Sequence, residues 1–331
     1  MSKPLIEIGR LQTHFFTDDG VVKAVDDVSL TIQTGKTLGI VGESGCGKSV
    51  TGLSIIRLIS EPGRIVGGYI DMHDDRKTVR LSSLSETALR KIRGGKISMI
   101  FQEPMTSLNP VFTIGSQISE AILLHQDVRT SEARRLAIEA LDRVKIPEPE
   151  RRALQFPHEF SGGMRQRAMI AMALACEPKL LIADEPTTAL DVTIQAQIID
   201  LLRDLQSTRD MSILIIAHDL GIMAEMADDI AVMYASKVVE YTSAKKLFTS
   251  PMHPYTHGLF KSRPEPGKPK TEWLDTIEGM VPSPLHFPAG CKFHPRCPYK
   301  QRCCEIEEPK IREIEPGQQA RCHFAGELTY E

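Results

Sequence analysis

Residues 42–49 read Gly-Glu-Ser-Gly-Cys-Gly-Lys-Ser and directly follow the apolar run 37–41. The run predicts a buried strand, and residues 49–58 predict a helix after the loop. Strand, glycine-rich loop and helix in this order are typical of a phosphate-binding loop, whose backbone N–H groups surround phosphate oxygens. We therefore assign nucleotide binding to Gly42, Glu43, Ser44, Gly45, Cys46, Gly47, Lys48 and Ser49. A chance glycine-rich turn is the alternative, but it does not explain eight positions in register.

The chemistry of such a loop assigns roles to its last two residues. Lys48 is expected to bridge the β- and γ-phosphates of a nucleoside triphosphate, and the Ser49 hydroxyl to ligate Mg²⁺. The helix that starts near Lys48 adds its positive end to the same anion.

Residues 180–185, Leu-Leu-Ile-Ala-Asp-Glu, form a second apolar run that ends in two carboxylates. The run predicts a strand whose carboxyl end carries Asp184, where ligands bind in open α/β sheets. Asp184 is expected to hold Mg²⁺ directly or through a water, and Glu185 to polarise the attacking water. Two solvated acids at a strand end are the alternative for this pair taken alone.

A Ser-Gly-Gly run at 161–163 stands between the phosphate loop and this acidic pair. The combination, followed by Pro-Thr-Thr-Ala-Leu-Asp at 186–191, resembles the ATP-binding cassette (ABC) ATPases. The resemblance implies an α/β P-loop NTPase fold with a mixed sheet core, an antiparallel β flank and a helical insertion at about 103–175. It places the nucleotide-binding domain in residues 1–250 and implies a pair of ATPase subunits that share two ATP molecules.

The same resemblance assigns further site residues. Gln102 and His218 match the glutamine loop and the switch histidine, which would sense Mg²⁺ or the attacking water and contact the γ-phosphate. Ser161, Gly162 and Gly163 match the signature motif, which binds the ATP held by the other subunit, and Asp191 matches the loop that links the two sites. Phe160 and Met164 replace the usual Leu and Gln of the signature. Phe15 and Phe16 are the candidates for stacking on adenine.

Composition limits the partners of the chain. Its 331 residues are 41% hydrophobic, and 40 Lys and Arg against 43 Asp and Glu give a net charge of −3. No basic field indicates nucleic-acid binding, and we expect no nucleic acid as a partner. No apolar run is long enough to span a bilayer, and no apolar leader follows Met1. We therefore expect a cytosolic chain unless a partner holds it at a membrane.

The region after about residue 250 differs in composition. Closely spaced prolines, with lysines among them, predict an extended linker, and five of the seven cysteines fall in the last 41 residues. We expect residues 251–331 to form an irregular, Cys-rich C-terminal extension.

Three stretches, 101–110, 251–256 and 290–298, narrow the resemblance to the ATPases of oligopeptide/dipeptide importers. This implies a heterodimer with a second, homologous ATPase, two transmembrane permease subunits and, indirectly, an extracytoplasmic solute-binding protein. The chain would lie peripherally on the cytoplasmic face of the inner membrane and drive uptake of dipeptides or oligopeptides. Alternatives are nickel or haem as the solute, or a soluble ABC ATPase without a transport role.

The spacing Cys291-x5-Cys297-x6-Cys304-x17-Cys322 matches the family's C-terminal pattern, which implies a [4Fe–4S] cluster held by four thiolates. Cys303 is the alternate to Cys304. Zn²⁺ is the alternative metal, although the close C-x₂₋₄-C pairs of structural zinc sites do not occur here. Free thiols remain the third interpretation.

Overall fold

The computed structural model describes residues 3–74, 77–102, 107–188, 191–262 and 276–330. The chain divides into two compact units. The first comprises Met1–Ile6, Ile32–Thr37 and Met72–Ala217, and the second comprises Glu7–Thr31, Leu38–Asp71 and His218–Glu331.

Three parallel strands form the core of the first unit. Strand β7 (Leu180–Asp184) pairs with β6 (Ile97–Ile100) on one side and with β8 (Ser212–Ile216) on the other. All residues of the three strands are buried, as expected for a parallel sheet covered on both faces. Helix α8 (Val192–Arg209) connects β7 to β8, which is the crossover that parallel neighbours require. The strand predicted for the apolar run that ends at Asp184 is therefore confirmed.

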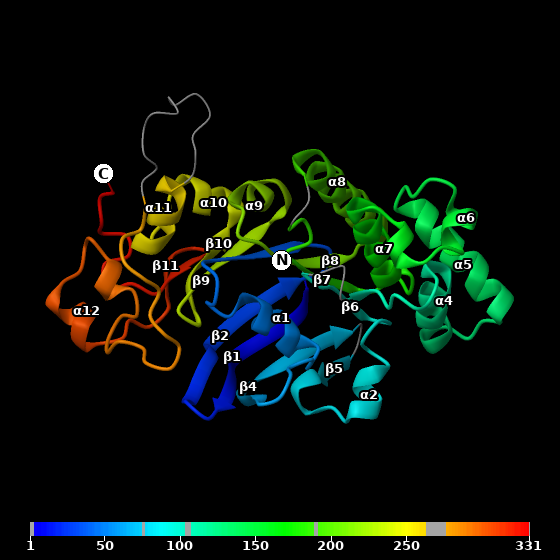
Figure 1. Ribbon diagram of the computed structural model, residues 1–331. Coiled ribbons are helices and arrows are strands. Elements are labelled where there is room, and N and C mark those ends of the chain that lie inside the picture. Colours follow the sequence, from blue (N-terminus) through cyan, green and yellow to red (C-terminus); the bar gives the residue numbers. More distant parts are fainter. Residues whose placement is uncertain (1–2, 75–76, 103–106, 189–190, 263–275, 331) are drawn as a thin grey trace. The chain divides into compact units, whose positions relative to one another are not determined.

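A helical group in the same unit lies between β6 and β7 in sequence. It contains α4 (Ile114–His125), α5 (Thr130–Arg143), α6 (Pro149–Ala153), η2 (Pro157–Glu159) and α7 (Gly162–Leu174). The four α-helices pack together (Figure 1). Helix α4 begins after Thr113, whose hydroxyl caps it by accepting the Ser116 N–H at 3.3 Å. Residues 103–106, where the insertion was predicted to start, lie outside the described residues. Shorter elements of the unit are β5 (Lys77–Arg80), η1 (Leu81–Ser83) and α2 (Glu86–Arg90).

The second unit contains long flanking strands. Strand β1 (Pro4–Thr17) lies between β2 (Gly20–Gln33) and β4 (Gly63–Asp74). Two residues join β1 to β2, a connection that only antiparallel neighbours allow. The antiparallel flank predicted for the fold is therefore present.

A mixed sheet forms the rest of this unit. Strand β3 (Thr37–Val41) runs parallel to β9 (Asp229–Tyr234), and β10 (Lys237–Ser243) runs antiparallel to β9. The helices are α1 (Lys48–Ile55), α9 (Leu220–Met226), α10 (Ala244–Thr249), α11 (Pro254–Lys261), η3 (His294–Arg296) and α12 (Arg302–Ile306).

The C-terminal extension is more regular than predicted. Its strand β12 (Gln318–Ala320) pairs antiparallel with β10 and with β11 (Arg312–Glu315), so the extension adds two strands beside β10. Strands of three or four residues show too little alternation to be recognised in sequence. The predicted proline-rich linker falls largely on residues 263–275, which lie outside the described residues.

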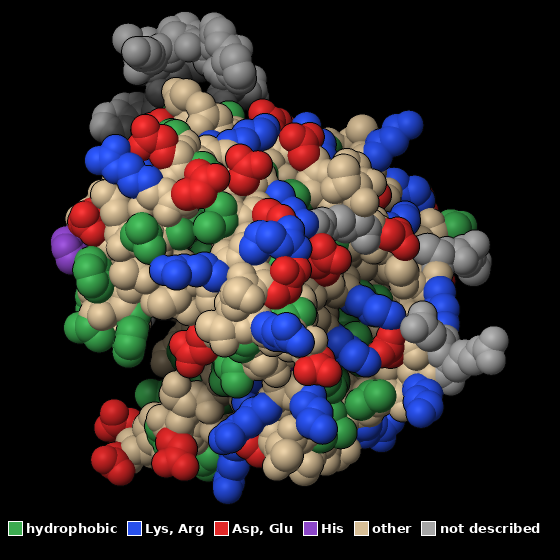
Figure 2. Space-filling view, turned by 90° about the vertical axis from the view of Figure 1, so that its right-hand side faces the viewer, with side chains coloured by type: hydrophobic (Ala, Val, Ile, Leu, Met, Phe, Trp, Pro, Cys, Tyr) green, Lys and Arg blue, Asp and Glu red, His purple; other side chains and the backbone are tan. Residues whose placement is uncertain are grey.

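The surface mixes charges of both signs. Lys and Arg side chains lie interspersed with Asp and Glu side chains over the face seen in Figure 2. Within the described ranges, every helix is too short or too polar to cross a bilayer.

Candidate nucleotide site

The phosphate loop follows β3 and needs glycine at particular positions. Gly42 and Gly47 have φ of 153° and 99°. A Cβ on Gly42 would lie 2.1 Å from the Met233 carbonyl oxygen, and one on Gly47 would lie 2.1 Å from the Ala24 carbonyl oxygen. Only glycine fits both the dihedral angle and the space. The loop is therefore fixed by backbone packing before any ligand binds.

Lys48 begins α1 and points back into the loop. Its ammonium donates to the Gly42 carbonyl at 2.8 Å and the Glu43 carbonyl at 3.0 Å, and the side chain is buried. Burial also raises the pKa of the neighbouring Cys46 thiol, which stays protonated. Ser49 follows in the first turn of α1, half-buried. The loop thus presents one cation, a hydroxyl and the positive end of a helix to an anion.

The acidic pair lies where β7 ends, in the first unit. Asp184 is buried, and Glu185 adopts φ 47° with its N–H donating to the Ile216 carbonyl at 2.8 Å. A non-glycine residue in this region costs of order 1 kcal/mol and often marks a functional turn. One Glu185 oxygen accepts from the Gln102 amide at 3.0 Å and the Thr188 hydroxyl at 2.8 Å. The structure therefore joins two predicted site residues that are 83 positions apart.

The signature run forms the start of α7 in the same unit. The Ser161 hydroxyl accepts the Met164 N–H at 3.3 Å and caps the helix. Ser161 and Gly162 are exposed, and no heavy atom lies within 4 Å of a Cβ built on Gly162. Gln166 on this helix donates to the Pro186 carbonyl at 2.6 Å, which connects the signature helix to the turn after Glu185. The exposed helix start is available to an anion from outside the unit.

The other predicted residues belong partly to the first unit and partly to the second. Asp191 is exposed and caps α8 by accepting the Ile194 N–H at 2.9 Å, while Ala189 and Leu190 before it lie outside the described residues. His218 is exposed in the second unit. Phe16 is exposed, with the Arg64 guanidinium 4.2 Å from its ring centre, whereas Phe15 is half-buried against Gly63.

The four predicted cluster ligands surround one cavity. Cys291, Cys297, Cys304 and Cys322 all line it, and Cys303 does not. Burial raises the pKa of Cys291 to about 11 and that of Cys297 to about 12, so both thiols are neutral near pH 7 without a metal. Across the described part of the chain, no three His, Cys, Asp or Glu side chains are grouped to hold a metal ion.

Sequence reasoning missed several buried polar residues of the second unit. Glu240 is fully buried and accepts the Met252 N–H at 2.8 Å, the His253 N–H at 2.9 Å and the Gln318 amide at 3.2 Å. Arg296 contacts Glu43 in the phosphate loop. These partners are distant in sequence, and no local pattern marks them.

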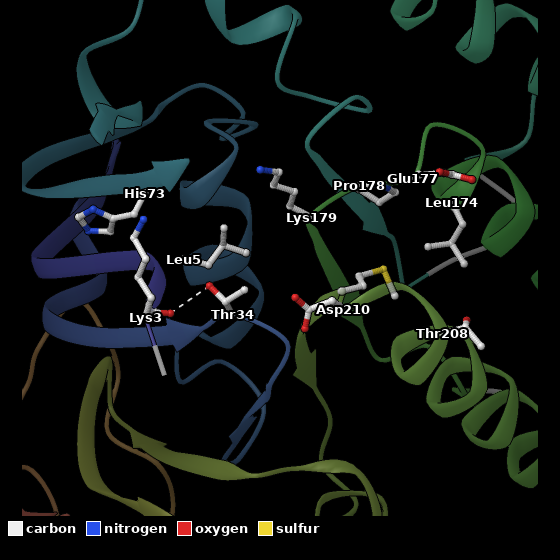
Figure 3. Close-up of a pocket in the computed structure, with 11 residues that line it drawn as sticks. Lys3, Leu5, Thr34, His73, Leu174, Glu177, Pro178, Lys179, Thr208 and Asp210 are labelled. Carbon is white, nitrogen blue, oxygen red and sulfur yellow. Dashed lines mark hydrogen bonds between the residues drawn. The ribbon is translucent and has the colours of Figure 1, made fainter. Parts of the chain in front are cut away.

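A cavity of about 770 Å³ lies elsewhere in the first unit (Figure 3). Pro178 and Lys179 before β7 and Met211 before β8 line it, and the Thr34 hydroxyl donates to the Lys3 carbonyl at its side. It therefore lies at the amino ends of β7 and β8, whereas Asp184 is at the carboxyl end of β7. Ligands of α/β sheets bind at the carboxyl ends, so this cavity is not the nucleotide site.

Comparisons with known proteins agree with these features. Residues 25–188 match the family model of ABC transporters, and residues 239–304 match that of the oligopeptide/dipeptide transporter C-terminal region. A peptide import ATP-binding protein of Brucella melitensis is 50% identical over 97% of this chain and 97% of the relative. The dipeptide transport ATP-binding protein DppD of Escherichia coli is 47% identical over 97% of this chain and 96% of its own.

Solved structures show the same fold. The dimeric ATP-binding cassette MJ0796, in a post-hydrolysis state with ADP and Pi, superimposes with a TM-score of 0.64 at 26% identity, covering 72% of this chain and 98% of that one. The cbiO1 subunit of the cbiONQ transporter complex from Clostridium perfringens gives 0.62 at 26% identity, covering 75% and 92%. The chain belongs to the ATP-binding cassette ATPases, in the oligopeptide/dipeptide transporter family.

Proposed function

We propose that this chain is the ATP-hydrolysing subunit of an importer that takes up dipeptides or oligopeptides. The observation that carries the proposal is that the likeness to peptide import ATP-binding proteins spans the cassette and the C-terminal extension alike. The extension distinguishes this family from a general cassette, because a separate family model describes it.

Each residue of the proposed site would have a separate role in ATP hydrolysis. Lys48 would bridge the β- and γ-phosphates, Ser49 and Asp184 would hold Mg²⁺ with Gln102, and His218 would contact the γ-phosphate. The metal would neutralise charge on the phosphates. Glu185 would polarise the attacking water, and the amide of Gln102 on its carboxylate holds that group in one orientation before substrate arrives.

Glu185→Gln tests this assignment in the full-length chain. Loss of the carboxylate should lower phosphate release by about 100-fold or more while ATP still binds, because general-base catalysis is lost and the phosphate loop is intact. Glu150→Gln changes an exposed carboxylate and serves as the control. Unchanged phosphate release from Glu185→Gln would remove Glu185 from the mechanism.

Two ATPase subunits would work together under two permease subunits, with Ser161, Gly162 and Gly163 binding the ATP of the partner and Asp191 linking the sites. The exposed signature supports this, because its helix start is open on the surface of the unit. The partner is proposed to be a homologous, different ATPase, and a solute-binding protein would deliver the peptide. Co-purification from membranes, followed by identification of the chains, tests the assembly; recovery of the chain alone would contradict it.

We propose that a groove in the helical group receives a helix of the permease. Helices α4, α5 and α6 line it, and Leu123, Leu124 and Leu154 at its sides are exposed by 42%, 74% and 60%. Apolar side chains exposed together mark interaction surfaces. This docking would place the chain on the cytoplasmic face of the membrane. Leu124→Glu should weaken assembly with the permease and leave the ATPase activity of the isolated chain unchanged.

The extension is proposed to hold a [4Fe–4S] cluster. Four thiolates around one cavity suit a cluster, because each binds a different iron and the sulfurs need not converge on one point. Zn²⁺, which takes four thiolates that converge on one ion, is the alternative metal. Anaerobic purification should give about four irons per chain, and Cys297→Ser should lower this content; iron-free wild-type protein would refute the cluster.

A further inference from the structure

The segment between the first two cysteines of the extension touches the phosphate loop. Arg296 donates through Nη1 to Glu43 Oε2 at 2.7 Å and through Nη2 to Oε1 at 3.1 Å. The Arg296 side chain is 5% exposed and that of Glu43 is 28% exposed. A two-pronged pair of this kind fixes direction as well as distance. The carboxylate of Glu43 is therefore held in one place by a residue 253 positions later.

The rest of the extension holds Arg296 itself. Its Nε donates to the Glu278 carbonyl at 3.0 Å, and Nη2 also donates to the Ile277 carbonyl at 3.0 Å. The guanidinium lies between these carbonyls and Glu43. Arg296 therefore has its orientation set on both sides.

The backbone of Glu43 has a second contact with the extension. Its N–H donates to the Tyr255 hydroxyl at 2.9 Å, and Tyr255 is fully buried. The Tyr255 ring packs against Tyr234 and Phe293, with ring centres 4.6 and 5.5 Å apart. Phe293 belongs to the same segment as Arg296. Both the amide and the carboxylate of Glu43 are thus bound by residues after position 250.

Glu43 places a negative charge in a loop that binds anions. Its carboxylate carries the same sign as a polyphosphate, and like charges a few ångströms apart repel. Its carbonyl also accepts from the Lys48 ammonium at 3.0 Å, so a shift of Glu43 would move the partner of that cation. Neutralising and fixing Glu43 keeps the loop suited to an anion.

We propose that Arg296 is a positioning residue for ATP binding, acting by neutralising and holding Glu43, with Tyr255 holding the backbone beside it. The extension is then a working part of the nucleotide site. This inference rests on the proposed function of the phosphate loop, so its test includes a variant of that loop.

The test measures binding of a slowly hydrolysed ATP analogue with Mg²⁺ to the full-length chain by equilibrium dialysis. Arg296→Ala should weaken binding about tenfold, because the phosphate loop then contains an unpaired carboxylate of the same sign as the ligand. Arg302→Ala removes an exposed arginine of the same extension and should bind as the wild type does. Arg296→Ala combined with Glu43→Gln should recover affinity to within about threefold, since no charge is left to neutralise.

The double variant separates positioning from anchoring. If Arg296 merely anchored the extension, the double variant would bind as weakly as Arg296→Ala, and that result overturns the proposal, as does wild-type binding by Arg296→Ala. Lys48→Ala should abolish binding; if it does not, the phosphate-loop assignment fails, whatever Arg296 does. Should Arg296→Ala fail to fold, Arg296→Gln, which removes the charge and keeps most of the side chain, is compared with and without Glu43→Gln in the same way.

Discussion

Glu240 should be a main anchor of the C-terminal extension, and Glu240→Ala tests how much stability it supplies. The carboxylate is fully buried in β10 and accepts the backbone N–H groups of Met252 and His253 and the side-chain amide of Gln318. Removing the acceptor leaves two buried backbone donors without that partner. Each such donor costs about 1–3 kcal/mol, so the expected loss of unfolding free energy is about 2–6 kcal/mol.

The assay is urea unfolding of the full-length chain, combined with hydrogen exchange at residues 251–262. Glu327→Ala removes an exposed carboxylate from the extension and should stay within about 0.5 kcal/mol of the wild type. We expect exchange in α11 to rise in Glu240→Ala, because the N–H groups that lose their acceptor lie directly before that helix. If the two variants are equally stable and exchange alike, the reasoning about buried donors at Glu240 is wrong.

Two further predictions concern the backbone and the pH dependence. Gly47→Ala should destabilise the nucleotide-free chain by at least about 1–2 kcal/mol more than Gly45→Ala. Both glycines have positive φ, but only a Cβ at position 47 would meet a carbonyl oxygen. Thermal unfolding of the two variants measures the difference, and an equal loss of stability in both would contradict the prediction. Complete burial lowers the pKa of His253 to about 3. As the pH falls, the histidine is therefore protonated in the unfolded chain before it is protonated in the folded chain. The stability that it contributes above pH 6.5 is lost as the pH falls toward 3. His253→Asn, which retains a cap acceptor for α11, should show a smaller loss between pH 7 and pH 5 in urea titrations; an equal loss would contradict a neutral His253.

The parts of the fold that could be predicted are those determined by residues close to one another in the sequence. The strand before Gly42 and the strand ending at Asp184 are continuous apolar runs, and the glycines between Gly42 and Lys48 are required by local dihedral angles. Both features can be predicted from a single sequence because the residues that determine each of them lie within ten positions of one another.

The parts that could not be predicted depend on distant partners. Arg296 pairs with a residue 253 positions away, and Gln318 meets Glu240 across 78 positions. Glu240 interrupts the apolar pattern of its strand, and the sequence does not show which distant groups donate hydrogen bonds to it. The contact between Gln102 and Glu185 was also absent from the sequence argument, which gave each residue a role by resemblance and no geometry.

These long-range contacts change how the extension is understood. Lys292 donates to Asp26 at 3.2 Å, and Arg321 lies 3.5 Å from Asp27, so two acids of β2 are paired from the C-terminal end. Exposed ion pairs contribute little, but both basic side chains here are at most 10% exposed, and removing either would leave an acid poorly compensated. The flank that contains β2, the phosphate loop and the sheet edge at β10 are therefore all completed by residues after 250. Such a segment cannot be varied independently of the cassette, which explains why it shares one compact unit with the phosphate loop.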